Sequence, residues 1–219
     1  MGYSQSDLAL KVMDQLKTDS TNWYEDLIVE KAFPNSKNAT ILVLPEFTDS
    51  AEMYFSLNTW IVIADNSTGA IKSKTYQHME SDAIVLTEFS IDSVMYQLTK
   101  DKQAIGVRTK YRGSSHANPY DYESLSLYVI DDSKITIVLE DFDMEEFWGE
   151  WDTNCAGEFT TQSKTFSLSK KSKNSYFTIL VKNEIQKEKN FINKAGECDS
   201  KSKLLTKNTK LIYQDRKYK

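Results

Sequence analysis

Apolar residues occur along this chain in short runs that predict β-strands. Residues 41–44 form a continuous apolar run that Pro45 closes, and residues 54–64, which include the apolar run 60–64, are expected to form a longer strand. Residues 71–76 then alternate between apolar and polar side chains, which is the period of a strand with one buried face. The sequence Asp-Asn-Ser-Thr-Gly at 65–69 tolerates left-handed backbone and predicts a hairpin turn between two of these strands.

The same pattern continues to the end of the chain. Further strands are expected at residues 84–86, 94–98, 104–111, 125–130, 135–139, 165–168, 176–181, 185–191 and 204–213, with a hairpin turn at 131–134. Short strands spaced by roughly 8–12 residues are typical of sandwiches, barrels and propeller-like folds. The segments show no fixed period, and no low-complexity linker divides them. We therefore expect one mainly β domain of antiparallel strands and hairpins, propeller-like or a sandwich.

One segment has the period of a helix instead. Ser6 or Asp7 can cap it, and one face then collects the apolar residues Leu8, Ala9, Val12, Met13 and Leu16. Residues 23–33 are ambiguous, although their β-branched centre favours a strand that ends at Pro34. We divide the chain into a helical lead, residues 1–20, and a single β-rich domain, residues 21–219.

Composition and charge argue against nucleic acid as a partner and against a segment that spans a membrane. The 219 residues are 40% hydrophobic and carry a formal net charge of -5. A chain of this length can bury a sizeable core. Its mild acidity argues against a general nucleic-acid binder, which needs a concentrated basic surface. No run approaches the ~20 apolar residues that span a bilayer, so we expect no transmembrane segment.

Charge is unevenly distributed along the chain. Residues 140–158 contain eight acidic side chains and no Lys or Arg, whereas basic residues outnumber acidic ones from Lys187 onward. Two interpretations remain open. The segments could be two solvated faces of opposite sign, or they could form an electrostatic patch that steers a partner.

No catalytic motif is complete. Ser114-Ser115-His116 places hydroxyls beside an imidazole, but adjacent residues of an extended chain point to opposite sides, and no nucleophile elbow is present. Glu150 and Asp152 would lie on the same side of one strand, whereas glycoside hydrolysis needs carboxyl groups across a cleft. The sequence also lacks a glycine-rich phosphate loop. We expect a protein that is not an enzyme and has no cofactor.

Metal binding has little support in the sequence. His78 and His116 are the two histidines, and the cysteines lack the Cys-x-x-Cys spacing of zinc sites. The acidic stretch, with Asp141 and Asp143, could bind a hard cation through its oxygens, although no calcium-loop motif is present. We therefore assign no metal site and keep calcium binding as an alternative.

Cys155 and Cys198 are the two cysteines of the chain. They could be unrelated buried thiols, or they could form one disulfide that closes a loop of roughly 40 residues. Both lie in polar, turn-like surroundings, whereas buried thiols usually have apolar neighbours. This favours the disulfide and an oxidising compartment.

The segment from 150 to 159 combines large rings, acids, a turn and a cysteine. A tightly specified turn is sufficient to explain it, but an exposed turn with tryptophan and acids would also suit a protein-binding hot spot. The candidate partner-binding residues are Trp148, Glu150, Trp151 and Asp152, with Glu145 and Glu146 on the rim.

Several strings together resemble a group of uncharacterised periplasmic or lipid-anchored proteins of Gram-negative bacteria. They are YFSLNTWIV at 54–62, YRGSS at 111–115 with NPY at 118–120, LSLY at 125–128, EWDTNCAGEF at 150–159 and GEC at 196–198. The resemblance covers about residues 40 to 215. It implies a periplasmic location and a Cys155–Cys198 disulfide, but no activity. Met1-Gly2 ahead of Tyr3 suits a remnant that replaces a removed signal peptide.

The strand–turn rhythm is also similar to that of small periplasmic propeller-like proteins that inhibit cell-wall hydrolases. We therefore expect a non-enzymatic periplasmic protein-binding domain. It would act as an immunity or inhibitor protein that neutralises a secreted toxin or a cell-wall hydrolase. The alternative is an envelope module of propeller-like architecture that binds a ligand or calcium.

Overall fold

The computed structural model describes residues 6–16, 22–34, 36–51, 54–131, 133–174 and 176–219, with only the backbone at 170–174. The elements are α1 (Asp7–Leu16), the 3-10 helix η1 (Glu25–Leu27), β1 (Val29–Ala32), β2 (Ala39–Ala51), β3 (Tyr54–Asp65), β4 (Ile71–Ser81), β5 (Ile84–Ile91), β6 (Tyr96–Gln97), β7 (Gln103–Gly113), β8 (Tyr120–Asp131), β9 (Lys134–Trp151), β10 (Gly157–Asn174), β11 (Tyr176–Ile192), β12 (Cys198–Leu211), β13 (Tyr213–Gln214) and β14 (Lys217–Tyr218).

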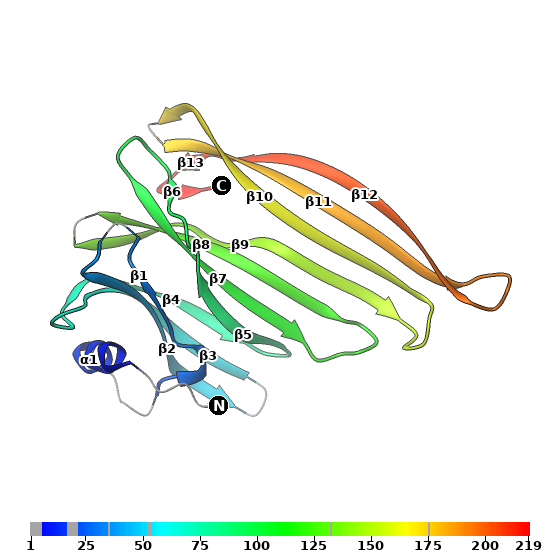
Figure 1. Cartoon of the computed structure of the whole chain (residues 1–219), viewed down its shortest axis with the longest axis horizontal. Coiled ribbons are helices and arrows are strands. Elements are labelled where there is room, and N and C mark those ends of the chain that lie inside the picture. Colours follow the sequence, from blue (N-terminus) through cyan, green and yellow to red (C-terminus); the bar gives the residue numbers. More distant parts are fainter. Residues whose placement is uncertain (1–5, 17–21, 35, 52–53, 132, 175) are drawn as a thin grey trace.

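The strands form two main antiparallel sheets and a small hairpin. The four-stranded sheet has the order β1-β2-β3-β4, and the larger sheet has the order β12-β11-β10-β9-β8-β7-β5 with β6 beside β7. The two sheets stack face to face, and β13 and β14 form a separate hairpin (Figure 1). The prediction of one mainly β domain with a short N-terminal helix is confirmed. Of the two architectures expected, the stacked sheets correspond to the sandwich.

The main core lies between the two sheets. The four-stranded sheet contributes Ile41, Val43 and Ile61, and the larger sheet contributes Val107 and Tyr128, all of them almost completely buried. The opposite face of the four-stranded sheet is covered by α1, whose Ala9, Val12, Met13 and Leu16 pack on Leu42, Leu44, Val62 and Ala64. This helix therefore buries the apolar stripe that its sequence period predicted.

A second core covers the other face of the larger sheet. Leu125, Leu127 and Val181 belong to it, and the C-terminal hairpin closes it through Tyr218. The Tyr218 hydroxyl donates to the backbone carbonyl of Phe177 over 2.8 Å. The C-terminal residues thus cap one end of the larger sheet (Figure 1).

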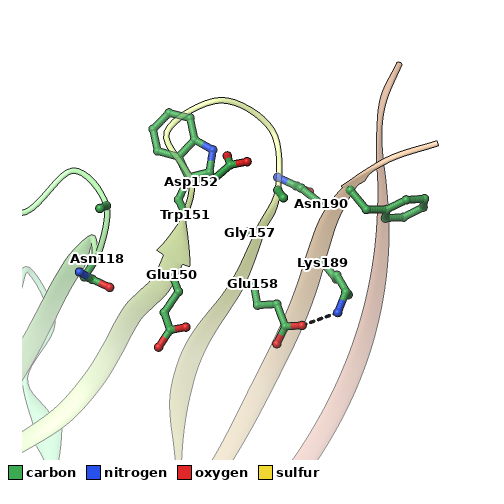
Figure 2. A pocket seen from close by; sticks show the side chains of 11 residues that line it. Asn118, Glu150, Trp151, Asp152, Gly157, Glu158, Lys189 and Asn190 are labelled. Atoms are coloured by element: carbon green, nitrogen blue, oxygen red, sulfur yellow. Dashed lines mark hydrogen bonds and ion pairs between the residues drawn. The ribbon is translucent and has the colours of Figure 1, made fainter. Parts of the chain in front are cut away.

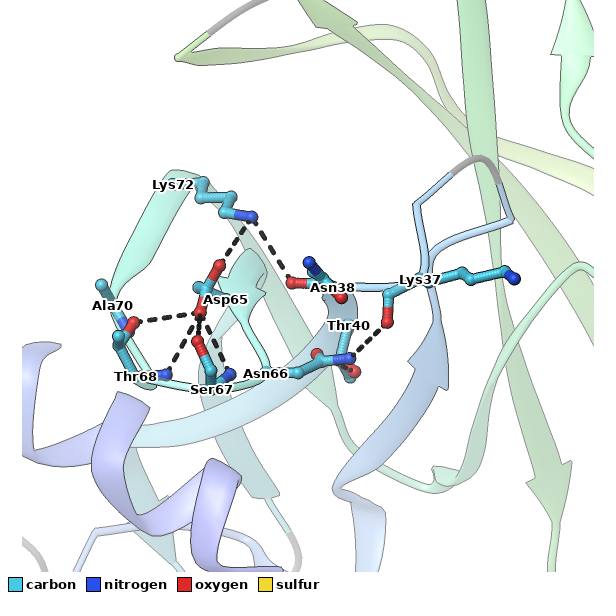
Figure 3. A network of polar contacts seen from close by, with 9 residues as sticks. All are labelled: Lys37, Asn38, Thr40, Asp65, Asn66, Ser67, Thr68, Ala70 and Lys72. Atoms are coloured by element: carbon cyan, nitrogen blue, oxygen red, sulfur yellow. Dashed lines mark hydrogen bonds and ion pairs between the residues drawn. The ribbon is translucent and has the colours of Figure 1, made fainter.

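The predicted turn at 65–69 is present and is held by one carboxylate. Asp65 Oδ1 accepts hydrogen bonds from the backbone N–H groups of Ser67 (3.0 Å) and Thr68 (3.1 Å), and Lys72 pairs with Oδ2 over 3.0 Å (Figure 3). The hydrogen bond from the Ser67 hydroxyl and the Lys72 charge lower the pKa of Asp65. Gly69 has φ +75°, which explains the glycine at this position.

Pro45 does not end the strand, contrary to the sequence prediction, because β2 continues to Ala51. In an antiparallel strand the N–H and C=O of one residue point to the same side. The Pro45 carbonyl accepts from the Tyr24 N–H, on the side away from β3 and beyond the last pair of β1 and β2, Val29 with Val43. The N–H that proline lacks would face residues 22–24, which pair there through the Trp23–Glu46 bridge, and the Tyr24 carbonyl accepts from the Leu27 N–H over 3.1 Å instead.

The later strands are much longer than their apolar runs predicted. Residues 176–181 and 185–191 belong to the single strand β11, and β9 and β10 span 18 residues each. We call residues 145–151, 157–163, 184–192 and 198–206 of β9–β12 the projecting part, because they extend past the four-stranded sheet (Figure 1). Strands that face solvent on both sides need no apolar period, so sequence patterns do not reveal them.

In the described part of the chain, no helix has the length and apolar character needed to cross a membrane.

Candidate functional site

The projecting part has two faces, which the pairing of β8, β9 and β10 defines. We call the face turned toward the four-stranded sheet the inner face and the opposite one the outer face. Tyr122 stacks on the core residue Tyr111 at 4.6 Å and pairs with Glu146, so Glu146 lies on the inner face. The pairing of β9 with β10 shows no register shift from Glu145 to Trp151. Alternation therefore places Trp148 and Glu150 with Glu146.

This geometry divides the six residues predicted to bind a partner. Three of them lie together on the inner face, namely Glu146, Trp148 and Glu150. Glu145 and Trp151 have the opposite parity and lie on the outer face. Asp152 lies beyond the end of β9, in the turn that leads to β10. One binding surface therefore cannot use all six residues equally.

On the inner face, an aromatic ring and an acidic side chain are open to solvent. Trp148 is 36% exposed, and its indole N–H has no hydrogen-bond partner among the described residues. Glu150 pairs across the strands with Glu158, which is held by Lys189 at 2.5 Å (Figure 2). The Lys189 ammonium lowers the pKa of Glu158. Glu150 has no such counterion in the part of the chain that the structure describes.

Basic residues continue the inner face on β11 and β12. Lys187 pairs with Thr160 on one side and with Lys203 on the other, while Lys189 pairs with Lys201. The Lys201 ammonium lies 5.2 Å from the centroid of the Phe191 ring. The acidic and basic segments of the sequence thus form adjacent strips on one face, which favours the interpretation of an electrostatic patch.

Asp152 shapes the turn between β9 and β10. Its Oδ1 accepts hydrogen bonds from the backbone N–H groups of Asn154 (2.9 Å) and Cys155 (2.8 Å), which lower the pKa of Asp152. The sequence predicted Asp152 beside Glu150 on one strand, but the strand ends at Trp151. The short side chain of Asp152 instead satisfies turn amides, as aspartate does in Asx-turns.

The predicted disulfide is present. Cys155 and Cys198 are joined, with Cα atoms 5.8 Å apart and a sequence separation of 43. The bridge connects the turn after β9 to the first residue of β12. It therefore fixes the outer end of all four strands of the projecting part.

On the outer face, the structure reveals a site that the sequence prediction missed. Phe147 and Phe159 lie there with parallel rings, 6.0 Å between centroids and 5° between planes. Gly149 and Gly157 flank Phe159, and a Cβ on Gly149 would come within 2.4 Å of the Phe159 ring. Two glycines on either side of a turn, followed by Phe, were the available signal.

The residues considered for catalysis and for metals serve local structure. Ser115 Oγ accepts from the Asn118 N–H (3.0 Å) in the loop between β7 and β8. Asp141 Oδ2 accepts from Gln77 Nε2 (2.7 Å). Among the described residues, no three His, Cys, Asp or Glu side chains gather as a metal site would require.

No family model matches the chain, and neither the curated proteins nor the solved structures contain a significant match. The function must therefore be inferred from the site itself.

Proposed function

We propose that this protein is a non-enzymatic protein-binding domain of the bacterial periplasm. It acts as an immunity or inhibitor protein that neutralises a secreted toxin or a cell-wall hydrolase. The observation that supports this proposal is the inner face of the projecting part, where exposed Trp148 adjoins Glu150, an acid without a counterion.

Trp148 has the properties of an interface anchor. Tryptophan is enriched among residues that dominate binding energy, because its large ring buries much area at a low cost in conformational entropy. Here the ring stands on a continuous antiparallel sheet, so little ordering is needed on binding. Acidic strips on β9–β10 and lysines on β11–β12 would then orient a partner of complementary charge.

The disulfide supports an exported location. Disulfides persist in oxidising compartments such as the bacterial periplasm and are rare in the cytosol. The Cys155–Cys198 bridge holds the end of the surface that we assign to binding. A rigid, bridged surface suits an inhibitor, which must survive outside the cytosol and bind without rearrangement.

A pull-down tests the proposal, with the purified oxidised protein as bait for envelope and secreted fractions. We expect one stoichiometric partner, a toxin or a hydrolase, whose enzymatic activity falls when the complex forms. Trp148→Ala should weaken capture by tenfold or more. Tyr76→Ala removes another exposed ring, 52% exposed on β4, and should not change capture. Absence of a partner for the folded bait, or unchanged capture by Trp148→Ala, would refute the proposal.

A further inference from the structure

The outer face of the projecting part carries a groove with two parallel aromatic rings in its floor. Two hollows, each of about 530 Å³, adjoin at Arg112, Asp121 and Phe147, and we treat them together as one groove. It runs over β5 and β7–β10 to the disulfide. This groove lies on the opposite side of the sheet from Trp148, so it is independent of the function proposed above.

The ring of Phe159 lies along the sheet instead of standing on it. A Cβ on Gly149 would meet its Cδ1 atom at 2.4 Å, and a Cβ on Gly157 would meet its Cε2 atom at 2.9 Å. Gly149 is directly opposite Phe159 on β9, and Gly157 precedes it by two positions on β10. One ring can approach both positions only by spanning the surface between them.

Phe147 extends this floor. Its ring is within 5° of parallel to that of Phe159, and the two centroids lie 6.0 Å apart, so the rings are parallel but stepped. Both residues are partly exposed and line the groove. The floor is therefore an apolar platform of two parallel, stepped rings, and Gly149 and Gly157 leave room for the ring of Phe159.

Polar side chains surround the platform. Arg112 and Asp121 form an ion pair of 2.7 Å on one side, with side chains 72% and 42% exposed. Thr161 and Asn154 provide a hydroxyl and an amide nearby. The site thus offers π-faces below and hydrogen-bond donors and acceptors around the edge.

We propose that this groove binds a flat, equatorially linked oligosaccharide, with its pyranose rings stacked on Phe147 and Phe159. The C–H bonds on the face of a pyranose ring are slightly positive and suit the negative face of an aromatic ring. Its equatorial hydroxyls point outward and need the donors and acceptors that Asp121, Arg112 and Asn154 supply. A glycan chain that extends as a flat ribbon can follow both parallel rings, whereas a curved chain bends away from one of them.

Titration followed by backbone amide NMR shifts tests this site, with chitotetraose and cellotetraose as probes and maltotetraose as the curved control. We expect saturable shifts at residues 112–121 and 147–161 with a dissociation constant in roughly the millimolar range, since an open groove covers one side of the ligand. No saturable shift with either flat tetrasaccharide, shifts elsewhere, or equal binding of maltotetraose would overturn the proposal.

Variants connect the shifts to the platform. Phe147→Leu keeps apolar volume but removes the ring, and it should weaken binding by about tenfold. Phe191→Leu, on the inner face of the neighbouring strand β11, is the matched control and should bind as the wild type does. Asp121→Asn changes an exposed rim residue without altering the floor, and it should weaken binding in a protein of unchanged melting temperature. Wild-type affinity in both groove variants would refute the site.

Discussion

At the scale of single residues, Asp141 is held in surroundings that oppose its charge. Its carboxylate accepts from Gln77 Nε2 at 2.7 Å, and Gln77 Oε1 in turn accepts from the hydroxyl of fully buried Tyr128 at 2.6 Å. Desolvation of the carboxylate, followed by the charge of Glu140, raises the pKa of Asp141. The backbone of Asp141 has φ 45°, a conformation that Asp and Asn tolerate better than other non-glycine residues.

We expect Asp141→Asn to increase the free energy of unfolding at neutral pH by only a few tenths of a kcal/mol, because Asp141 is an exposed residue and solvent screens part of the effect. Because the pKa is higher in the folded state, the folded protein binds the proton more tightly, and stability falls as pH rises through the interval between the unfolded and folded pKa values. Asparagine avoids this loss and keeps an acceptor for Gln77. Urea unfolding at about pH 7 and pH 3 measures the effect, which should shrink at the lower pH. Asp143→Asn is the control on the same strand, and a less stable Asp141→Asn protein at neutral pH would contradict the argument.

The sequence identified the residue types of the candidate site, but it predicted only in part on which face of the sheet each residue lies. Strand alternation is sufficient to group Trp148 with Glu150, and the structure confirms it. Asp152 does not follow the strand alternation, because it lies in the turn after β9. Its carboxylate accepts hydrogen bonds from two backbone N–H groups of that turn. The platform of Phe147 and Phe159 depends on pairing between strands, which the order of residues along the chain does not reveal.

At the scale of elements, α1 depends on its cap and on its packing. Ser6 Oγ accepts from the Ala9 N–H at 3.1 Å and donates to Glu30 Oε1 at 2.5 Å, so one hydroxyl caps the helix and ties it to β1. Ser6→Ala should lower the free energy of unfolding by about 1 kcal/mol, because an N–H at the first turn loses its partner. Chemical denaturation measures this loss, and Ser6→Thr, which retains both the capping acceptor and the donor to Glu30, should lose less. Equal loss in the two variants would show that the cap contributes nothing.

Element boundaries were harder to predict than element types. The helix was found almost to the residue, because its apolar period and its capping serine agree. The expectation at Pro45 was wrong, because a proline ends a strand only where the ladder needs an N–H at that position. Here the facing carbonyl of Tyr24 accepts from the Leu27 N–H instead. The break expected between 181 and 185 does not exist, because Asn183 continues the ladder between Lys164 and Lys207.

At the scale of the whole molecule, the mainly β character follows from the spacing of strands, but the stacking does not. Residues of β2 and β3 face α1 and the larger sheet alternately, so these strands are buried on both sides and read as continuous apolar runs. Nothing in such a run says which face meets which sheet. The projecting part is less predictable still, because its length is set by strand pairing and by the bridge at its end and not by an apolar core.

That bridge leads to a prediction about the distribution of stability. The Cys155–Cys198 disulfide joins the β9–β10 turn to β12 at the solvent-exposed end of the projecting part, far from the two main cores. Replacing both cysteines by serine removes the constraint on the unfolded chain, and we expect the free energy of unfolding to fall by about 2–4 kcal/mol. Hydrogen exchange should accelerate most in residues 151–160 and 190–200, where few apolar contacts remain to hold the strands. Amides of β2, β3 and β8 should keep their relative order of protection, because their contacts are unchanged. Uniform acceleration across both sheets would instead mean that the projecting part and the cores unfold as one unit, and unchanged exchange at the tip would mean that strand pairing alone holds it.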